Sequence, residues 1–130
     1  MTFDLWMLSA AAFIGLVHIS LQGLSYKAQV GNAFSVGARD SEPAATGFAG
    51  RMARAQRNFL ESFPLFAAAV LVAHASGKAG TLSAAGSALY VAARALYIPA
   101  YAAGIPYVRT VIWQAAMIGL VIVLAAPLLT

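Results

Sequence analysis

The chain has 130 residues, of which 62% are hydrophobic and 9% are charged, and its formal net charge is +4. Soluble domains carry roughly 25% charged residues, and small ones bury proportionally little surface, so this composition excludes a soluble globular domain and indicates an integral membrane protein. Cysteine is absent, which excludes disulfides, thiolate metal sites and a cysteine nucleophile. The basic residues form neither a long run nor an aromatic–basic platform, so we expect no nucleic-acid partner.

Four apolar stretches are long enough to cross a bilayer as helices, which requires about 20 residues each. They cover residues 5–25, 55–76, 80–103 and 109–129, with ends defined to within a few residues. Their content of alanine and leucine, without period-two alternation, favours helices over strands. We therefore predict an all-α fold: a single domain over residues 1–130 that forms a bundle of four transmembrane helices.

The connections between these stretches are unequal in length and in charge. Residues 27–50 are predicted to form the one long loop, and the other connections are short. The side of the first and third loops holds six basic residues, and the opposite side holds Lys78 alone. The positive-inside rule then predicts that these loops are cytoplasmic and both termini are outside, in the inner membrane if the cell is bacterial.

A polar stripe enters the second apolar stretch. Residues three and four apart share a helix face, so Arg54, Arg57, Asn58 and Glu61 are expected on one side of the first turns. Ionisable side chains at membrane depth are costly, and they commonly mark functional sites. We interpret this stripe as a candidate binding surface.

The third stretch carries a second stripe, with Tyr90, Arg94, Tyr97 and Tyr101 on one face. The helical rise of about 1.5 Å per residue places both stripes in the same leaflet, where they are expected to line one cavity open to the cytoplasm. The arginines outnumber the single glutamate, so an anionic ligand is expected.

Each of these observations also has a structural explanation. Arg51 and Arg54 are explained more simply as interfacial anchors. Arg57 with Glu61 is explained equally well as a buried ion pair, and Tyr90 and Tyr97 also fit the role of packing residues. The two histidines lie in different stretches without a second ligand at metal-binding spacing, so no metal site is expected.

The combined pattern resembles the MAPEG family, the membrane-associated proteins in eicosanoid and glutathione metabolism. The resemblance is carried by a second-stretch motif and by a later set of polar residues. The motif runs Arg54-Ala-Gln-Arg57-Asn58-x-x-Glu61-x-x-Pro64, and the later residues are Arg94, Tyr97, Tyr101, Arg109 and Thr110. The first loop looks like that of bacterial members. Two positions depart from the family pattern: Phe59 stands where many members carry Asp, and Ser62 where Asn is common.

The resemblance implies a homotrimer of four-helix subunits that binds glutathione between neighbours and acts on a hydrophobic electrophile or lipid. It implies that Arg109 stabilises the glutathione thiolate as the catalytic residue. It also implies a set of ligand-binding positions: Arg57, Asn58, Glu61, Tyr97, Tyr101, Arg54, Arg94, Thr110 and, for a first-helix arginine of relatives, Lys27.

The chemistry of these residues suits a tripeptide with two carboxylates, an ammonium group and a thiol. Arginine binds carboxylates through paired donors, Glu61 is suited to the ammonium, and Arg109 beside the sulfur would favour the reactive thiolate. A non-catalytic protein that binds lipid or another amphiphile on the same scaffold is the alternative. A proton-coupled multidrug transporter ranks last, because the first stretch offers only Asp4, at its edge, as a carboxylate.

Overall fold

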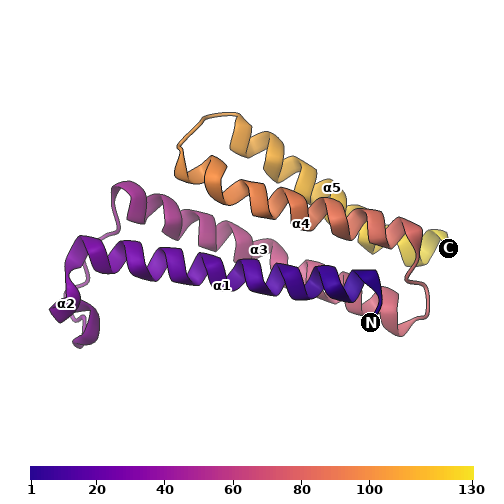
Figure 1. Ribbon diagram of the computed structural model, residues 1–130, viewed down its shortest axis with the longest axis horizontal. Coiled ribbons are helices and arrows are strands. Elements are labelled where there is room, and N and C mark those ends of the chain that lie inside the picture. The colour runs from indigo at the N-terminus through magenta and orange to yellow at the C-terminus, as the bar shows by residue number, and fades with distance from the viewer.

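The computed structural model describes residues 1–130 and contains helices only, which confirms the all-α prediction (Figure 1). The helices are α1 (Phe3–Val30), α2 (Asn32–Val36), α3 (Gly47–Ala75), α4 (Thr81–Ala102) and α5 (Val108–Leu129). Four of them are long, and α2 is a short helix of 5 residues.

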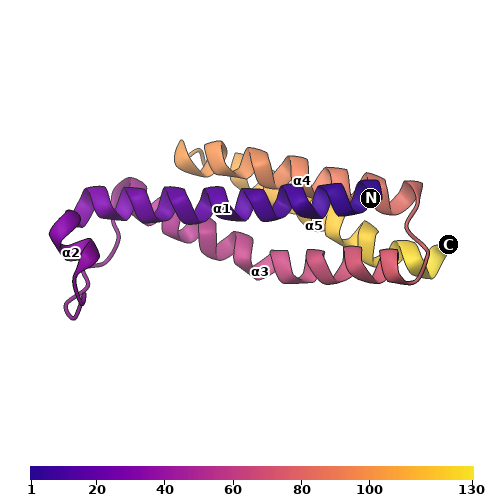
Figure 2. The same ribbon diagram turned by 60° about the horizontal axis from the view of Figure 1, so that its bottom comes forward.

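The four long helices run side by side and alternate in direction. Both termini and the α3–α4 turn lie at one end, whereas α2 and the α4–α5 turn lie toward the other (Figures 1 and 2). The closest pairing is between α4 and α5, and α1 packs mainly on α3. This connectivity places the predicted first and third loops at the same end of the bundle.

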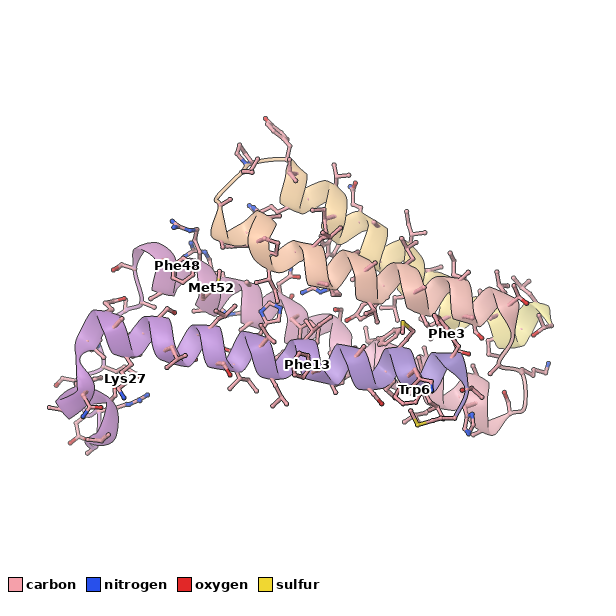
Figure 3. All side chains as sticks on the ribbon, in the orientation of Figure 1. Phe3, Trp6, Phe13, Lys27, Phe48 and Met52 are labelled. Carbon is pink, nitrogen blue, oxygen red and sulfur yellow. The ribbon has the colours of Figure 1, made fainter.

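Three of the long helices, α1, α3 and α5, are long and apolar enough to cross a membrane. Large apolar side chains are exposed on them: Trp6 and Phe13 project from α1 with 58% and 65% of their surface exposed (Figure 3). Helix α4 matches α5 in length, with 22 residues each, but its serines, tyrosines and arginine lower its hydropathy. The count of four spans therefore stays a prediction.

The predicted long loop over residues 27–50 is shorter in the structure. Helix α1 continues to Val30 and α3 begins at Gly47, because the helical pattern extends beyond the apolar stretches from which the spans were predicted. The first three turns of α3 bury a residue at nearly every third or fourth position: Ala49, Met52, Ala55 and Phe59. This spacing defines a packed face, and the arginines between these residues lie outside it.

The remaining loop, between α2 and α3, is hydrogen-bonded to α1. The hydroxyl of Tyr26 donates to the carbonyl of Pro43, and Gln29 bonds to the carbonyl of Ala44 and to the backbone N–H of Thr46, both at 2.9 Å. These contacts fix the point at which the chain enters α3.

The α4–α5 pair is held together by glycines. A Cβ on Gly86 would lie 2.8 Å from the carbonyl oxygen of Gly119, and a Cβ on Gly119 would lie 2.7 Å from that of Gly86. Only residues without a side chain allow the two backbones this close. The resulting core includes Tyr90, whose ring stacks on that of Phe66 with the centroids 4.0 Å apart. The Tyr90 hydroxyl shares a hydrogen bond of 2.8 Å with the hydroxyl of Ser62.

The same N-terminal end of α4 is joined to α1 through a buried carboxylate. Ser83 and Ser87 donate to Asp4 at 3.0 and 2.8 Å, and Asp4 is only 2% exposed. The sequence placed Asp4 at the edge of the first span. In the structure it connects two helices that are distant in the chain.

Candidate functional site

Arg94 is the most deeply buried charged residue of the two predicted stripes, with no exposed surface. Its Nη1 donates to Oδ1 of Asn58 at 2.8 Å. The guanidinium lies over the rings of Phe59 and Tyr97, 5.4 and 4.5 Å from their centroids. The polar stripe of α4 (Tyr90, Arg94, Tyr97 and Tyr101) therefore faces α3. Arg94 binds Asn58, which belongs to the polar stripe of α3, and is not exposed at the surface.

Phe59 connects this centre to α1. His18 is buried and stacks on Phe59 with the ring centroids 5.0 Å apart. Neither ring nitrogen of His18 has a hydrogen-bond partner, and neither do Nε and Nη2 of Arg94. Helices α1, α3 and α4 thus meet at this point, where the ring of Phe59 lies between His18 of α1 and Arg94 of α4.

A second group of cations surrounds Tyr101 near the C-terminal end of α4. Arg54 donates through Nε to the Tyr101 hydroxyl at 3.0 Å, and the guanidinium of Arg109 lies over the same ring at 5.1 Å. Arg51 donates to the carbonyl of Ala102 at 3.2 Å. Helices α3, α4 and α5 each contribute to this group, and none of its arginines has a carboxylate partner.

Arg57 and Glu61 lie on the outer face of α3 and are exposed. The alternative that they form a buried ion pair is wrong, since the one salt bridge in the chain joins Arg39 and Glu42 at 3.7 Å. The packed face of α3 explains this result: Asn58 turns toward α4, and the residues beside it in the stripe turn outward.

Thr110 and Lys27 are exposed and lie apart from these contacts. Lys27, in the last turn of α1, lies beside α2 and away from Phe48 and Met52 (Figure 3). Thr110 is in the first turn of α5, directly after Arg109. Within one chain, Lys27 does not join the cluster that Tyr101 organises.

The structure divides the predicted site into an inner and an outer part. The inner part holds Asn58, Arg94 and Tyr97, and the outer part holds Arg54, Tyr101 and Arg109 together with the exposed Arg57 and Glu61. The expectation of a cavity between the two stripes is not met within a single chain. Of the four hollows on its surface, none is lined by any of these residues.

Chemically, the outer part is an exposed surface with several cationic donors and one carboxylate acceptor. Guanidinium groups offer several donors each, and those of Arg54, Arg57 and Arg109 have no carboxylate to neutralise them. Glu61 adds an acceptor for a positively charged group. A flexible ligand with both charges can therefore be held on this face.

Sequence reasoning gave no role to His18, Ser62 or Asp4. Each is a polar residue in an apolar stretch, and each is buried in the structure. The signal available in the sequence was helical spacing: Ser62 and Ser87 fall on the packed faces of α3 and α4. Which polar residues would meet across helices depends on tertiary packing.

The chain was also compared with known proteins. No curated protein and no solved structure matches it. The model of one family, MAPEG, matches residues 7–129, nearly the whole chain, and the residues brought together at Asn58, Arg94 and Tyr101 are those that carried the resemblance. The chain belongs to the MAPEG family.

Proposed function

We propose that this membrane protein is a glutathione-dependent transferase or peroxidase that activates the glutathione thiolate for attack on hydrophobic electrophiles. Membership of a family of glutathione and eicosanoid metabolism is the starting point. The observation that carries the proposal is the group of arginines around Tyr101, which has no internal carboxylate. Glutathione would bring the missing anionic groups.

The charges on α3 support a site between subunits. Arg57 and Glu61 are exposed on a helix apolar enough to cross a membrane. Leaving both against lipid hydrocarbon is costly, so a ligand and a second copy of the chain would cover them. In the proposed homotrimer, Lys27 of a neighbour reaches the ligand that its own subunit does not approach.

The proposed topology follows from the same face. Helix α4 would cross the membrane beside α5, to which it is closely packed. The end that carries Arg51, Arg54 and Arg109 would lie at the cytoplasmic side, with both termini outside. Glutathione would then enter from the cytoplasm, and the electrophile from the lipid.

The residues have separate roles in the proposed reaction. Arg57, Asn58 and Glu61 would bind the charged groups of the tripeptide, and Tyr97 and Tyr101 would form the adjacent wall. Arg109 would stabilise the thiolate sulfur, because a thiol reacts as its anion and a neighbouring cation favours that form. In the transferase reaction the thiol proton would pass to water. The sulfur would then form a bond to the electrophilic carbon of the substrate while the bond from that carbon to its leaving group breaks, and the leaving group would depart with the bonding electron pair.

A non-catalytic amphiphile-binding protein is the second candidate. It is favoured by a hollow of about 530 Å³ between the end of α1 and the start of α3. Its walls are mostly apolar and include Leu21, Leu24 and Phe48, which would suit an acyl chain. In that case the arginines would hold an anionic head group without activating a thiol.

The deciding experiment is a titration of the purified protein, in detergent or nanodiscs, with glutathione. Binding is followed by calorimetry and thiolate formation by ultraviolet absorbance. Arg109→Ala is expected to abolish the thiolate signal while retaining most of the binding, and Glu61→Gln is expected to weaken binding. Arg39→Ala, an arginine of the loop paired with Glu42, is the control and should behave as the unmodified protein.

Each outcome separates the candidates. Glutathione binding with thiolate formation supports the transferase. Retained lipid binding without any thiolate signal supports the amphiphile-binding protein. Thiolate formation and conjugation at unmodified rates in Arg109→Ala would remove the mechanism.

A further inference from the structure

Asn58 is bound from inside the protein, although it belongs to the stripe that faces outward. Its Oδ1 accepts a hydrogen bond from Nη1 of Arg94. A side-chain amide has one acceptor group and one donor group, whereas a guanidinium can only donate. The contact therefore has one possible polarity, with the amide oxygen directed inward and the NH2 group left for the partly exposed side of α3.

We propose that Arg94 is a positioning residue that fixes the amide of Asn58, so that Asn58 offers a donor to the ligand. In this arrangement Asn58 selects an acceptor, a carboxylate or carbonyl oxygen, and rejects an ammonium group. The inference rests on the proposed binding of glutathione along the α3 stripe, and it assigns the polarity of one contact in that site.

The surroundings of Arg94 hold it in one place. Phe59 and Tyr97 both lie close to the guanidinium, and His18 stacks on Phe59. Asn58 is its only hydrogen-bond acceptor, because Nε and Nη2 have no partner. No other acceptor in the protein competes with Asn58 for this guanidinium.

Stability alone does not account for this arginine. Burying a charged group with unpaired donors is unfavourable, and an apolar side chain of similar volume commonly serves a protein interior as well or better. A purely structural role therefore predicts a residue such as methionine at this position. Methionine can supply neither the hydrogen bond to Asn58 nor the cation–π contacts with Phe59 and Tyr97, and of these contacts only the hydrogen bond reaches a polar residue of the α3 stripe.

A double-mutant cycle tests the proposal through glutathione affinity. Arg94→Met is expected to weaken binding about tenfold, as expected for the loss of a hydrogen bond to a charged group. In an Asn58→Ala background the same change is expected to have no further effect, because Arg94 acts through the amide. Tyr90→Phe, which removes another buried hydrogen bond of α4, is the matched control and should leave affinity unchanged.

Thermal stability without ligand separates positioning from support of the fold. Arg94→Met is expected to melt no lower than Tyr90→Phe. A parallel loss of stability and affinity, or additive effects in the cycle, would overturn the role of Arg94 and leave the proposed function intact. Absence of glutathione binding by the unmodified protein would instead remove both.

A spectroscopic test needs no substitution. The chain has two asparagines, Asn32 in α2 and Asn58. In protein labelled with ¹⁵N-asparagine, glutathione is expected to shift the side-chain NH2 signal of Asn58 and slow its proton exchange with water, with Asn32 as internal control. Glutathione binding that leaves the Asn58 signal unchanged would contradict the assigned polarity.

Discussion

The glycine contact between α4 and α5 makes a quantitative prediction for Gly119→Ala. The added Cβ would lie 2.7 Å from the carbonyl oxygen of Gly86 and 2.7 Å from the backbone nitrogen of Tyr90, whereas ordinary contact begins at 3.4 Å. Both neighbours are backbone atoms, so no side chain can rotate away. The two helices must separate by most of an ångström.

The energetic consequence is a balance of two effects. Overpacking a core typically costs about 1–3 kcal/mol, and here the strain falls on backbone atoms, which places it near the upper end. Alanine regains about 1 kcal/mol in a helix because glycine is the poorer helix former. We therefore expect a net loss of about 2 kcal/mol in the free energy of unfolding.

The assay is unfolding of the purified protein in micelles, followed by circular dichroism. Gly23→Ala is the matched control: Gly23 lies inside α1, and a Cβ there would meet nothing within 4 Å. It is expected to stabilise the protein by up to about 1 kcal/mol. If Gly119→Ala proved as stable as Gly23→Ala, the account of close α4–α5 packing would be refuted.

Three further substitutions test contacts at the ends of the bundle. Asp4→Ala removes the carboxylate that accepts from Ser83 and Ser87, and only Ser83 keeps another acceptor, the carbonyl of Gly80. The substitution is expected to cost about 2 kcal/mol in chemical unfolding, and a loss no larger than that of a surface alanine substitution would count against the contact. Tyr101→Phe removes the hydroxyl that accepts from Arg54 but keeps the ring, so glutathione affinity measured by calorimetry should fall about fivefold. An unchanged affinity would place Tyr101 outside the site. Tyr26→Phe removes the hydrogen bond from Tyr26 to the carbonyl of Pro43, so limited proteolysis within residues 37–46 should become faster while glutathione affinity stays constant. Equal cleavage rates would show that the contact does not restrain the loop.

Much of the architecture follows from local properties of the chain. Composition alone indicates a membrane protein, and helical propensity with long apolar stretches predicts the long helices. The end of α4 at Ala102 and the start of α5 at Val108 lie within one residue of the prediction, because a short glycine- and proline-containing turn separates them. The start of α3 was missed by eight residues, because hydropathy falls at the arginines although the helical spacing of buried residues continues.

The candidate site shows the same division. The spacing of Arg54, Arg57, Asn58 and Glu61 along one helix could be read from the sequence, and so could the family resemblance confirmed over residues 7–129. Spacing cannot determine which member of a stripe turns inward. Asn58 meets Arg94, whereas Arg57 and Glu61 stay exposed, because the rotation of α3 is set by its packed face.

The sequence by itself determined the class of protein, the approximate helices and the residues that carry charge into the membrane, because these depend on composition and short-range spacing. Tertiary structure alone decided the partners: Asp4 with serines 79 and 83 positions away, and Arg94 with an asparagine 36 positions away. Such pairs form only when helix packing brings their side chains together and excludes water. The spacing of residues along one helix carries no information on how that helix is rotated against its neighbours.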